Sequence, residues 1–181
     1  MRTVTQNSKA LYPFKYLSLR KGKHRLRCDR MTNIPDHDLV RLAAAAFEIA
    51  RGAGRVVMKK RNQSMQIQCK IDGSPATAAD KASEEFICKA LKKLTPEIAI
   101  IAEESAIDSQ LDSIGDKPFW LIDPLDGTKD FIAGECEFVI NIALIIGDTP
   151  YIGVIHAPAL DETYLGCKGQ GATRVRNDKA E

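Results

Sequence analysis

The first half of the chain has a hydrophobic pattern with helical spacing. From Asp36 to Lys60 the apolar residues recur three and four positions apart, which predicts one long amphipathic helix with an alanine-rich buried stripe. A second helix is predicted from Thr77 to about Lys93, because Thr77 and Asp80 have the spacing of a capping residue followed by an acid in the first turn. The residues of this second helix expected to face the core are Ala82, Phe86, Ala90 and Leu94.

Shorter apolar runs predict strands. Met65, Ile67 and Cys69 alternate with polar residues, which is typical of a half-exposed strand. Short buried strands are predicted at 98–101 and 119–122. The antiparallel strands predicted after them, separated by turns, lie at 138–146, 151–156, 163–167 and 172–175. This order predicts an α+β fold, in which helices pack on one face of a largely antiparallel sheet.

Charge is distributed unevenly along the chain. Residues 1–30 contain nine Lys and Arg against one acid, whereas the remaining 151 residues contain 17 basic and 23 acidic groups. We expect residues 1–30 to form a basic and disordered leader, and residues 31–181 to form one folded domain. A targeting or membrane-surface role for the leader is left open. The acidic body lacks an aromatic and basic pattern, so we expect no nucleic-acid polymer as partner.

The cysteines and the hydropathy bear on the compartment. The five cysteines form no CxxC pair and have no histidine at metal-ligand spacing, which indicates reduced thiols and makes a zinc site improbable. No apolar run is long enough, at about 18 residues, to predict a spanning helix. We therefore expect a cytoplasmic protein, with peripheral association at the inner membrane left open by the basic leader.

Carboxylates mark the ends of several predicted elements. Glu103 and Glu104 follow one short strand, Asp123 and Asp126 follow the next, and Asp80 lies near a helix start. Carboxylates that gather at one edge of a sheet repel one another, and a cation relieves that repulsion. Oxygen ligands favour Mg²⁺, which can activate a water for attack on a phosphate ester while a second ion stabilises the leaving oxygen.

The stretch W-L-I-D-P-L-D-G-T from Trp120 suits such chemistry locally. Pro124 stiffens the backbone between two aspartates three apart, and the Leu125 carbonyl is a further candidate ligand. Gly127 and Thr128 follow at a predicted helix start, where free N–H groups favour a phosphate, and Thr128 could also hydrogen-bond a water.

Each of these fragments also has an ordinary structural reading. Asp before Pro or Gly is a common turn signal, and a Glu pair commonly ends a strand in solvent. Their combination in this order is what favours a phosphatase. Other phosphate and metal motifs do not fit, because the chain has no Walker loop and no calcium-loop spacing of acids. The aspartate spacing also differs from that of haloacid-dehalogenase-type phosphatases.

Three motifs together resemble the inositol monophosphatase superfamily: K-I-D-G-S-P-A-T-A-A-D at 70–80, A-E-E-S at 102–105, and W-L-I-D-P-L-D-G-T at 120–128. Members of this superfamily are Mg²⁺-dependent, lithium-sensitive phosphatases of small molecules with a layered αβαβα fold. The stretch from Leu125 to Ile145 is more similar to bacterial 3'(2'),5'-bisphosphate nucleotidases, which act on adenosine 3',5'-bisphosphate, a by-product of sulfate assimilation. The resemblance runs from about residue 36 to 175.

The resemblance also implies roles for individual residues. It implies that two or more Mg²⁺ ions are held by Glu103, Asp123, the Leu125 carbonyl and Asp126, and that Asp80 and Thr128 orient and deprotonate the attacking water. The phosphate and substrate contacts it implies are Glu103, Asp126, Gly127 and Thr128, and the loop over the site would contain Lys70 and Asp72. Glu104 is expected beside the ligands.

The family pattern continues into a second α/β layer with one further metal-binding aspartate, which residues up to Glu181 do not contain. The resemblance therefore implies only the N-terminal half of the layered fold. It also implies an apolar face that packs against the remaining half or against another copy of the chain. An inositol-phosphate phosphatase and a catalytically inactive metal-binding remnant stay as alternatives.

Overall fold

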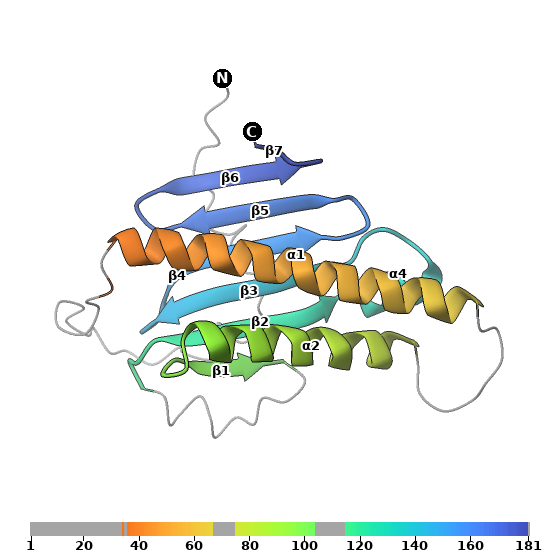
Figure 1. The fold of residues 1–181 in the computed structure, drawn as a ribbon, viewed down its shortest axis with the longest axis horizontal. Helices are drawn as coiled ribbons and strands as arrows, with labels where there is room; N and C mark the ends of the chain where they lie inside the picture. Colours follow the sequence, from red (N-terminus) through yellow and green to blue (C-terminus); the bar gives the residue numbers. More distant parts are fainter. Residues whose placement is uncertain (1–33, 35, 67–74, 104–114, 181) are drawn as a thin grey trace.

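The computed structural model describes residue 34 and residues 36–66, 75–103 and 115–180. In this part of the chain, two long helices cover one face of a seven-stranded sheet (Figure 1). The helices are α1 (Asp36–Gln66), α2 (Pro75–Leu94) and the short α4 (Thr128–Ala133). The strands are β1 (Ala99–Ala102), β2 (Phe119–Asp126), β3 (Val139–Ile146), β4 (Thr149–Ala157), β5 (Glu162–Cys167), β6 (Gly171–Arg176) and β7 (Lys179–Ala180).

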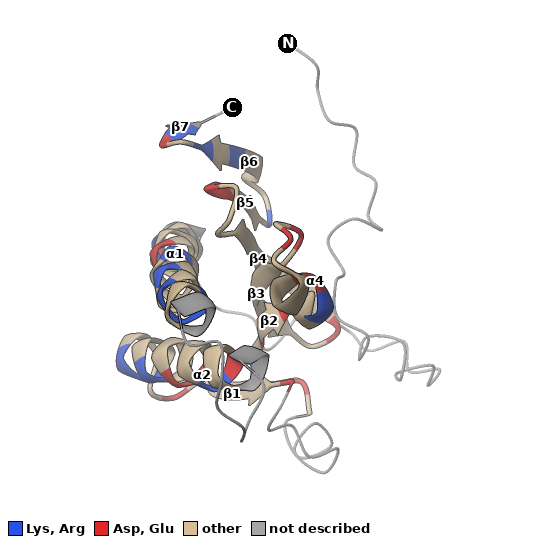
Figure 2. Ribbon diagram, turned by 90° about the vertical axis from the view of Figure 1, so that its right-hand side faces the viewer, with Lys and Arg blue, Asp and Glu red and all other residues tan. Residues whose placement is uncertain are grey.

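The strands lie in the sheet in their sequence order, from β1 to β7. Only the β1–β2 pair is parallel among the described strands, and every later neighbour is antiparallel. Figure 2 views the sheet nearly edge-on, with α1 and α2 on the same side of it. The predicted α+β fold with a largely antiparallel sheet is therefore confirmed.

Helix α1 packs closely on the sheet because its buried stripe is built from small residues. Ala46, Ala50 and Ala53 are fully buried. At Gly54 the backbone comes so near strand β4 that a Cβ atom would lie 2.5 Å from Nε2 of His156. A larger residue at this position would push the helix away from the sheet.

Helix α2 buries mainly a different stripe from the one predicted, although the predicted Leu94 is partly buried and packs against the core. The residues in its core stripe are Ala79, Ser83, Ile87 and Leu91, all fully buried. Phe86 was expected in the core but is 39% exposed, with its ring placed against Gly52 of α1. The prediction was wrong because apolar residues occupy two adjacent stripes of this helix, and a 3.6-residue period alone does not choose between them.

The strand predicted to begin at Met65 was also wrong at its start, because α1 continues to Gln66. Its last turns are rich in Lys, Arg, Gln and Met, which are good helix formers. The rest of that predicted strand, with Ile67 and Cys69, lies outside the described residues.

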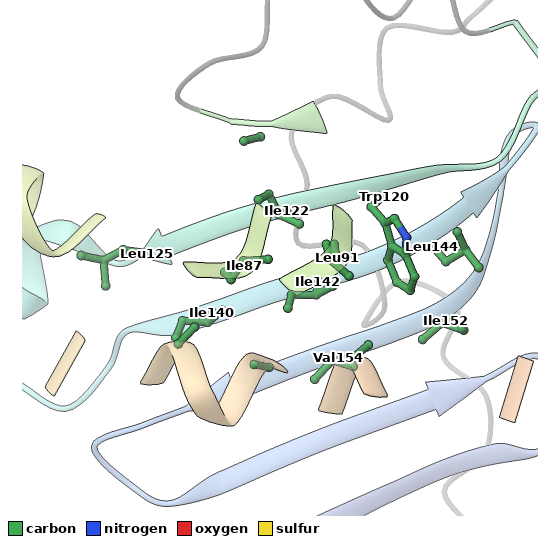
Figure 3. Close-up of a cluster of buried hydrophobic side chains, with 14 of the residues drawn as sticks. Ile87, Leu91, Trp120, Ile122, Leu125, Ile140, Ile142, Leu144, Ile152 and Val154 are labelled. Atoms are coloured by element: carbon green, nitrogen blue, oxygen red, sulfur yellow. The ribbon is translucent and has the colours of Figure 1, made fainter. Parts of the chain in front are cut away.

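The main core fills the space between the helices and the sheet (Figure 3). Ile87 and Leu91 of α2 meet Trp120, Ile122 and side chains from β3 and β4. Trp120 is fully buried, and its Nε1–H donates a 2.9 Å hydrogen bond to Oγ1 of Thr95. This bond satisfies the one polar group of the largest core side chain.

The alternate residues of the same strands face the other side of the sheet, because successive side chains of a strand point to opposite faces. On that side the buried apolar residues form a second cluster: Ile101, Phe119, Leu121, Ala143 and Ile145. None of the helices in the described part of the chain is long and apolar enough to cross a membrane.

Candidate metal and phosphate site

Asp123 lies where the pairing of β2 with β3 becomes irregular. Asp123 pairs with Asn141 and Asp126 pairs with Val139, so β2 uses one residue more than β3 over this stretch. Pro124 falls inside this bulge, where its missing N–H breaks no ladder bond. The Leu125 N–H donates a 3.3 Å hydrogen bond to Oδ1 of Asp123, which fixes the turn.

Helix α2 supports this bulge from the core side. The Ser83 hydroxyl donates a 2.9 Å hydrogen bond to the backbone oxygen of Pro124. Asp80 precedes Ser83 by three residues, so it shares that helix face, and it is buried with 7% exposure. The structure therefore places Asp80 on the side of α2 that meets the end of β2.

Glu103 reaches Asp123 from the neighbouring strand. It follows β1 directly, and its N–H donates a 3.1 Å hydrogen bond to the Ile122 oxygen, which extends the parallel pairing by one residue. The Glu103 side chain is hydrogen-bonded to the Asp123 carboxyl. Two carboxyl groups on adjacent strands are therefore in direct contact.

The electrostatics of Asp123 reflect this crowding. Burial raises the pKa of the Asp123 carboxyl to about 8, with further upward contributions from the Glu103 hydrogen bond, the Glu103 charge and the Asp126 charge. The Leu125 N–H acts in the opposite direction. A bound cation would reverse this balance, because it stabilises the ionised carboxylate.

The predicted acids are not all equally close. Within the described residues, no group of three or more His, Cys, Asp or Glu side chains surrounds a single point as a metal site would. Glu103 and Asp123 meet, whereas Asp126 is exposed and lies beyond the bulge. The gathering of all four acids around one ion stays a prediction. Lys70, Asp72 and Glu104 lie outside the described residues.

Gly127 and Thr128 form the start of α4. Gly127 has φ of 91°, and a Cβ atom there would lie 2.6 Å from the Glu137 oxygen, so only glycine fits without strain. Thr128 is half-buried at the first position of this six-residue helix. A helix this short adds little dipole, so any attraction for phosphate depends on the individual N–H groups.

Aromatic packing holds α4 against the end of α1. Phe131 and Phe138 meet edge to face with ring centroids 5.2 Å apart. The guanidinium of Arg61, itself buried, lies 5.2 Å from the Phe138 centroid and 6.0 Å from the Phe131 centroid. These contacts fix the helix that follows the Asp126-Gly127 turn.

Sequence reasoning did not select three residues that shape this region: Ser83, Arg61 and Asn141. No local signal distinguishes Ser83 or Arg61, because their contacts are made with distant segments. Asn141 did carry a signal, since it is the only polar residue in the apolar run of β3. A polar amide in an otherwise apolar buried strand is uncommon and indicates a specific role.

The oxygen atoms at this site suit a hard divalent cation. The carboxylates of Glu103 and Asp123, together with the nearby backbone and amide oxygens, are the ligand type that Mg²⁺ prefers over softer metals. Burial first, and then the neighbouring Glu103 and Asp126, raise the pKa of Asp123, and a bound cation would offset both the desolvation and the repulsion. The donor set therefore fits the metal that the sequence predicts.

A separate surface cavity of about 200 Å³ lies between α1 and β4, with Gly54 and His156 in its lining. Its Arg51 is paired with Asp178 at 2.8 Å and with Asp161 at 3.6 Å. None of the acids predicted for the metal site lines this cavity.

Comparison with known proteins identifies the family. The sequence matches the model of the inositol monophosphatase family over residues 38–179. The chain belongs to the inositol monophosphatase family.

Several curated relatives agree with this assignment. The 3'(2'),5'-bisphosphate nucleotidase CysQ of Escherichia coli (strain K12) is 38% identical over 125 residues, which cover 68% of this chain and 50% of that protein. An inositol monophosphatase of Mesembryanthemum crystallinum is 33% identical over 140 residues, which cover 77% of this chain and 51% of that protein. The chain spans about half the length of the curated relatives it matches.

A solved structure gives the same answer for the fold. CysQ from Bacteroides thetaiotaomicron, described as a bacterial member of the inositol monophosphatase family, matches with a TM-score of 0.67 and 33% identity. The match covers 76% of this chain and 49% of that one.

Proposed function

We propose that this protein acts as a Mg²⁺-dependent phosphomonoesterase that removes one phosphate from adenosine 3',5'-bisphosphate. The observation that carries the proposal is the contact of the buried Asp123 carboxyl with the half-buried Glu103 at the end of β2, beside the D-P-L-D-G-T turn. The similarity to proteins named 3'(2'),5'-bisphosphate nucleotidase supports the substrate class. We further propose that the reaction serves sulfate assimilation in the cytoplasm.

In this proposal the cation, when bound to Glu103, Asp123, the Leu125 carbonyl and Asp126, supplies charge stabilisation and a more acidic water. Asp80 and Thr128 would orient the attacking water, and Asp80 would receive its proton. The water oxygen forms a bond to phosphorus as the bond to the nucleoside oxygen breaks in line with it, and the released nucleoside oxygen takes up a proton from solvent. The N–H groups of Gly127 and Thr128 hold the phosphate oxygens.

The proposed partners follow from the same reasoning. The substrate is a small phosphorylated nucleotide, and no nucleic-acid polymer is involved. Because the chain spans about half the length of its relatives, we propose that full activity requires a second α/β layer, or self-association through the sheet face that the helices leave uncovered. The basic residues at 1–30 leave a peripheral membrane association as a secondary proposal.

A second candidate is a protein that binds a divalent cation without hydrolysing a phosphate ester. It is supported by the extent of the match, since the chain spans only about half the length of the curated relatives. The relative named inositol monophosphatase also supports an inositol phosphate as the alternative substrate.

The test measures phosphate release by this chain from adenosine 3',5'-bisphosphate and from inositol 1-phosphate. Each assay is run with Mg²⁺, without it, and with added lithium, and the Asp123→Asn variant serves as control. We expect Mg²⁺-dependent, lithium-inhibited release from the nucleotide that is lost in the variant. Release from inositol phosphate alone would overturn the substrate assignment, and Mg²⁺ binding without any release would support the second candidate.

A further inference from the structure

Asn141 completes a row of polar side chains across three neighbouring strands. It pairs directly with Asp123 of β2, and residues paired in this way project to the same face of a sheet. Glu103 follows β1 on the other side of Asp123 and hydrogen-bonds to it. The next row along this face is apolar, with Leu121 and Ala143.

The amide of Asn141 is buried without satisfaction. The residue is 1% exposed, and in the described part of the chain neither its Nδ2 nor its Oδ1 atom has a hydrogen-bond partner. Its neighbour on β4 is Ile155, which offers no polar side chain. The Asp123 carboxyl is instead engaged by the Leu125 N–H and by Glu103.

A buried asparagine amide without hydrogen-bond partners lowers the stability of the fold. A buried amide that lacks partners loses its hydrogen bonds to water without replacement, whereas an apolar side chain of similar shape would not. Orphaned groups of this kind are rare in native proteins and commonly mark a place where a water, an ion or a ligand binds.

We propose that Asn141 is a binding residue of this site, and that its amide hydrogen-bonds the water molecules around a divalent cation held by Glu103 and Asp123; this inference rests on the proposed function. Water suits both halves of the amide, because it accepts from Nδ2–H and donates to Oδ1. Mg²⁺ in particular gives up its waters reluctantly and usually keeps several of them in a protein site. The orphaned amide and the crowded carboxyl pair are then satisfied by the same occupant.

The experiment compares Mg²⁺ binding with metal-free stability in three forms of the full 181-residue chain. These are the wild type, Asn141→Leu, and the control Ile145→Leu, which changes a buried residue on the same strand face. Calorimetric titration gives the Mg²⁺ affinity, and thermal unfolding without metal gives the stability. In ¹⁵N-labelled protein, the side-chain amide signal absent from Asn141→Leu is followed during the titration.

We expect Asn141→Leu to bind Mg²⁺ about tenfold more weakly, as is usual when a residue supporting a metal site is lost. Its metal-free midpoint should equal or exceed that of the wild type, and Ile145→Leu should keep wild-type affinity. The Asn141 amide signal should shift with Mg²⁺ and not with sodium at equal ionic strength.

Two results would overturn the inference while leaving the proposed function standing. One is equal Mg²⁺ affinity in the wild type and Asn141→Leu. The other is a lower metal-free midpoint for Asn141→Leu, which would show that the amide makes structural hydrogen bonds. A wild-type chain that binds no Mg²⁺ would instead overturn the proposed function, and this inference with it.

Discussion

The hydroxyl of Ser83 donates a 2.9 Å hydrogen bond to the backbone oxygen of Pro124, and so joins helix α2 to the bulge at the end of β2. Both groups are buried, so neither can exchange this bond for one to water. The bond fixes the turn that separates Asp123 from Asp126. It also holds the helix face on which Asp80 lies.

Removing this hydroxyl should destabilise the protein. We expect Ser83→Ala to lower the free energy of unfolding by about 1–3 kcal/mol, because it leaves a buried carbonyl without its donor. The control is Thr149→Ala, which removes an exposed hydroxyl bonded to Asp148 and should cost less than about 0.5 kcal/mol. Urea unfolding followed by the fluorescence of the single tryptophan measures both. An equal loss of unfolding free energy in the two variants would show that the Ser83–Pro124 hydrogen bond contributes no more to stability than an exposed one.

Gly127 should be intolerant of any side chain. In Gly127→Ala the new Cβ meets the Glu137 oxygen at 2.6 Å and also requires an unfavourable positive φ. The matched control is Gly147→Ala, where φ is 62° but no atom lies within 4 Å of the Cβ position. We expect the control to lose about 1 kcal/mol of stability from backbone strain, and Gly127→Ala to lose distinctly more. Similar unfolding midpoints for the two variants would contradict the described packing of the turn.

The hydrogen bond of Trp120 to Thr95 gives a third prediction. Thr95→Val keeps the shape of the side chain but leaves the buried indole N–H without its 2.9 Å acceptor, so we expect a loss of about 1–3 kcal/mol. Thr95→Ser retains the hydroxyl and should lose less. Urea unfolding with tryptophan fluorescence distinguishes them, and the reverse order of stability would be inconsistent with this hydrogen bond.

His156 should make the fold sensitive to acid. It is 4% exposed, and burial lowers the pKa of its ring to about 4, with Arg51 and Arg55 adding to the effect and the Glu162 backbone bond and Asp161 opposing it. In the unfolded chain the His156 ring is protonated as the pH falls through about 6.5. In the folded chain it stays neutral until the pH falls to about 4. Stability supported by the neutral ring is complete above pH 6.5 and is lost as the pH falls to 4, by on the order of 3 kcal/mol.

The measurement is the free energy of unfolding of the wild type and His156→Gln across this pH range. The wild type should lose stability more steeply between pH 6.5 and 4 than the variant. Parallel curves would show that His156 is not the residue responsible.

The sequence predicted the architecture because its strongest patterns are long and regular. The helical spacing from Asp36 onward and the succession of short apolar runs each persist over many residues. They therefore predict helices and strands even where single residues fit either structure. Helix α2 shows the limit, because two apolar stripes lie side by side and only packing against α1 and the sheet selects the one with Ile87.

The site was predictable where its residues are adjacent in the chain. Asp123, Asp126 and Gly127 form a local turn whose bulge and positive φ follow from proline and glycine. The contact of Glu103 with Asp123 was expected from neighbouring strand ends. The support from Ser83 and the position of Asn141 depend on tertiary pairing and strand register, which one-dimensional spacing does not specify.

The raised pKa of Asp123 also predicts how Mg²⁺ binding depends on pH. A carboxyl with a pKa of about 8 keeps its proton at pH 6, so the metal must displace that proton to bind. We therefore expect the Mg²⁺ affinity to rise from pH 6 to pH 8, and proton release to be largest at the lower pH. Calorimetry in buffers of different ionisation enthalpy counts the released protons, and an affinity that falls over this range would contradict the assignment.

The most direct test of the metal site is a calorimetric titration of Mg²⁺ into the wild type and Asp123→Asn at pH 8. The carboxyl pair with Glu103 predicts saturable binding by the wild type and at least tenfold weaker binding by the variant. It also predicts that Asp123→Asn is the more stable of the two without metal, because the substitution removes the repulsion within the pair. Equal Mg²⁺ binding by the two proteins, or none by either, would contradict a metal site at the end of β2.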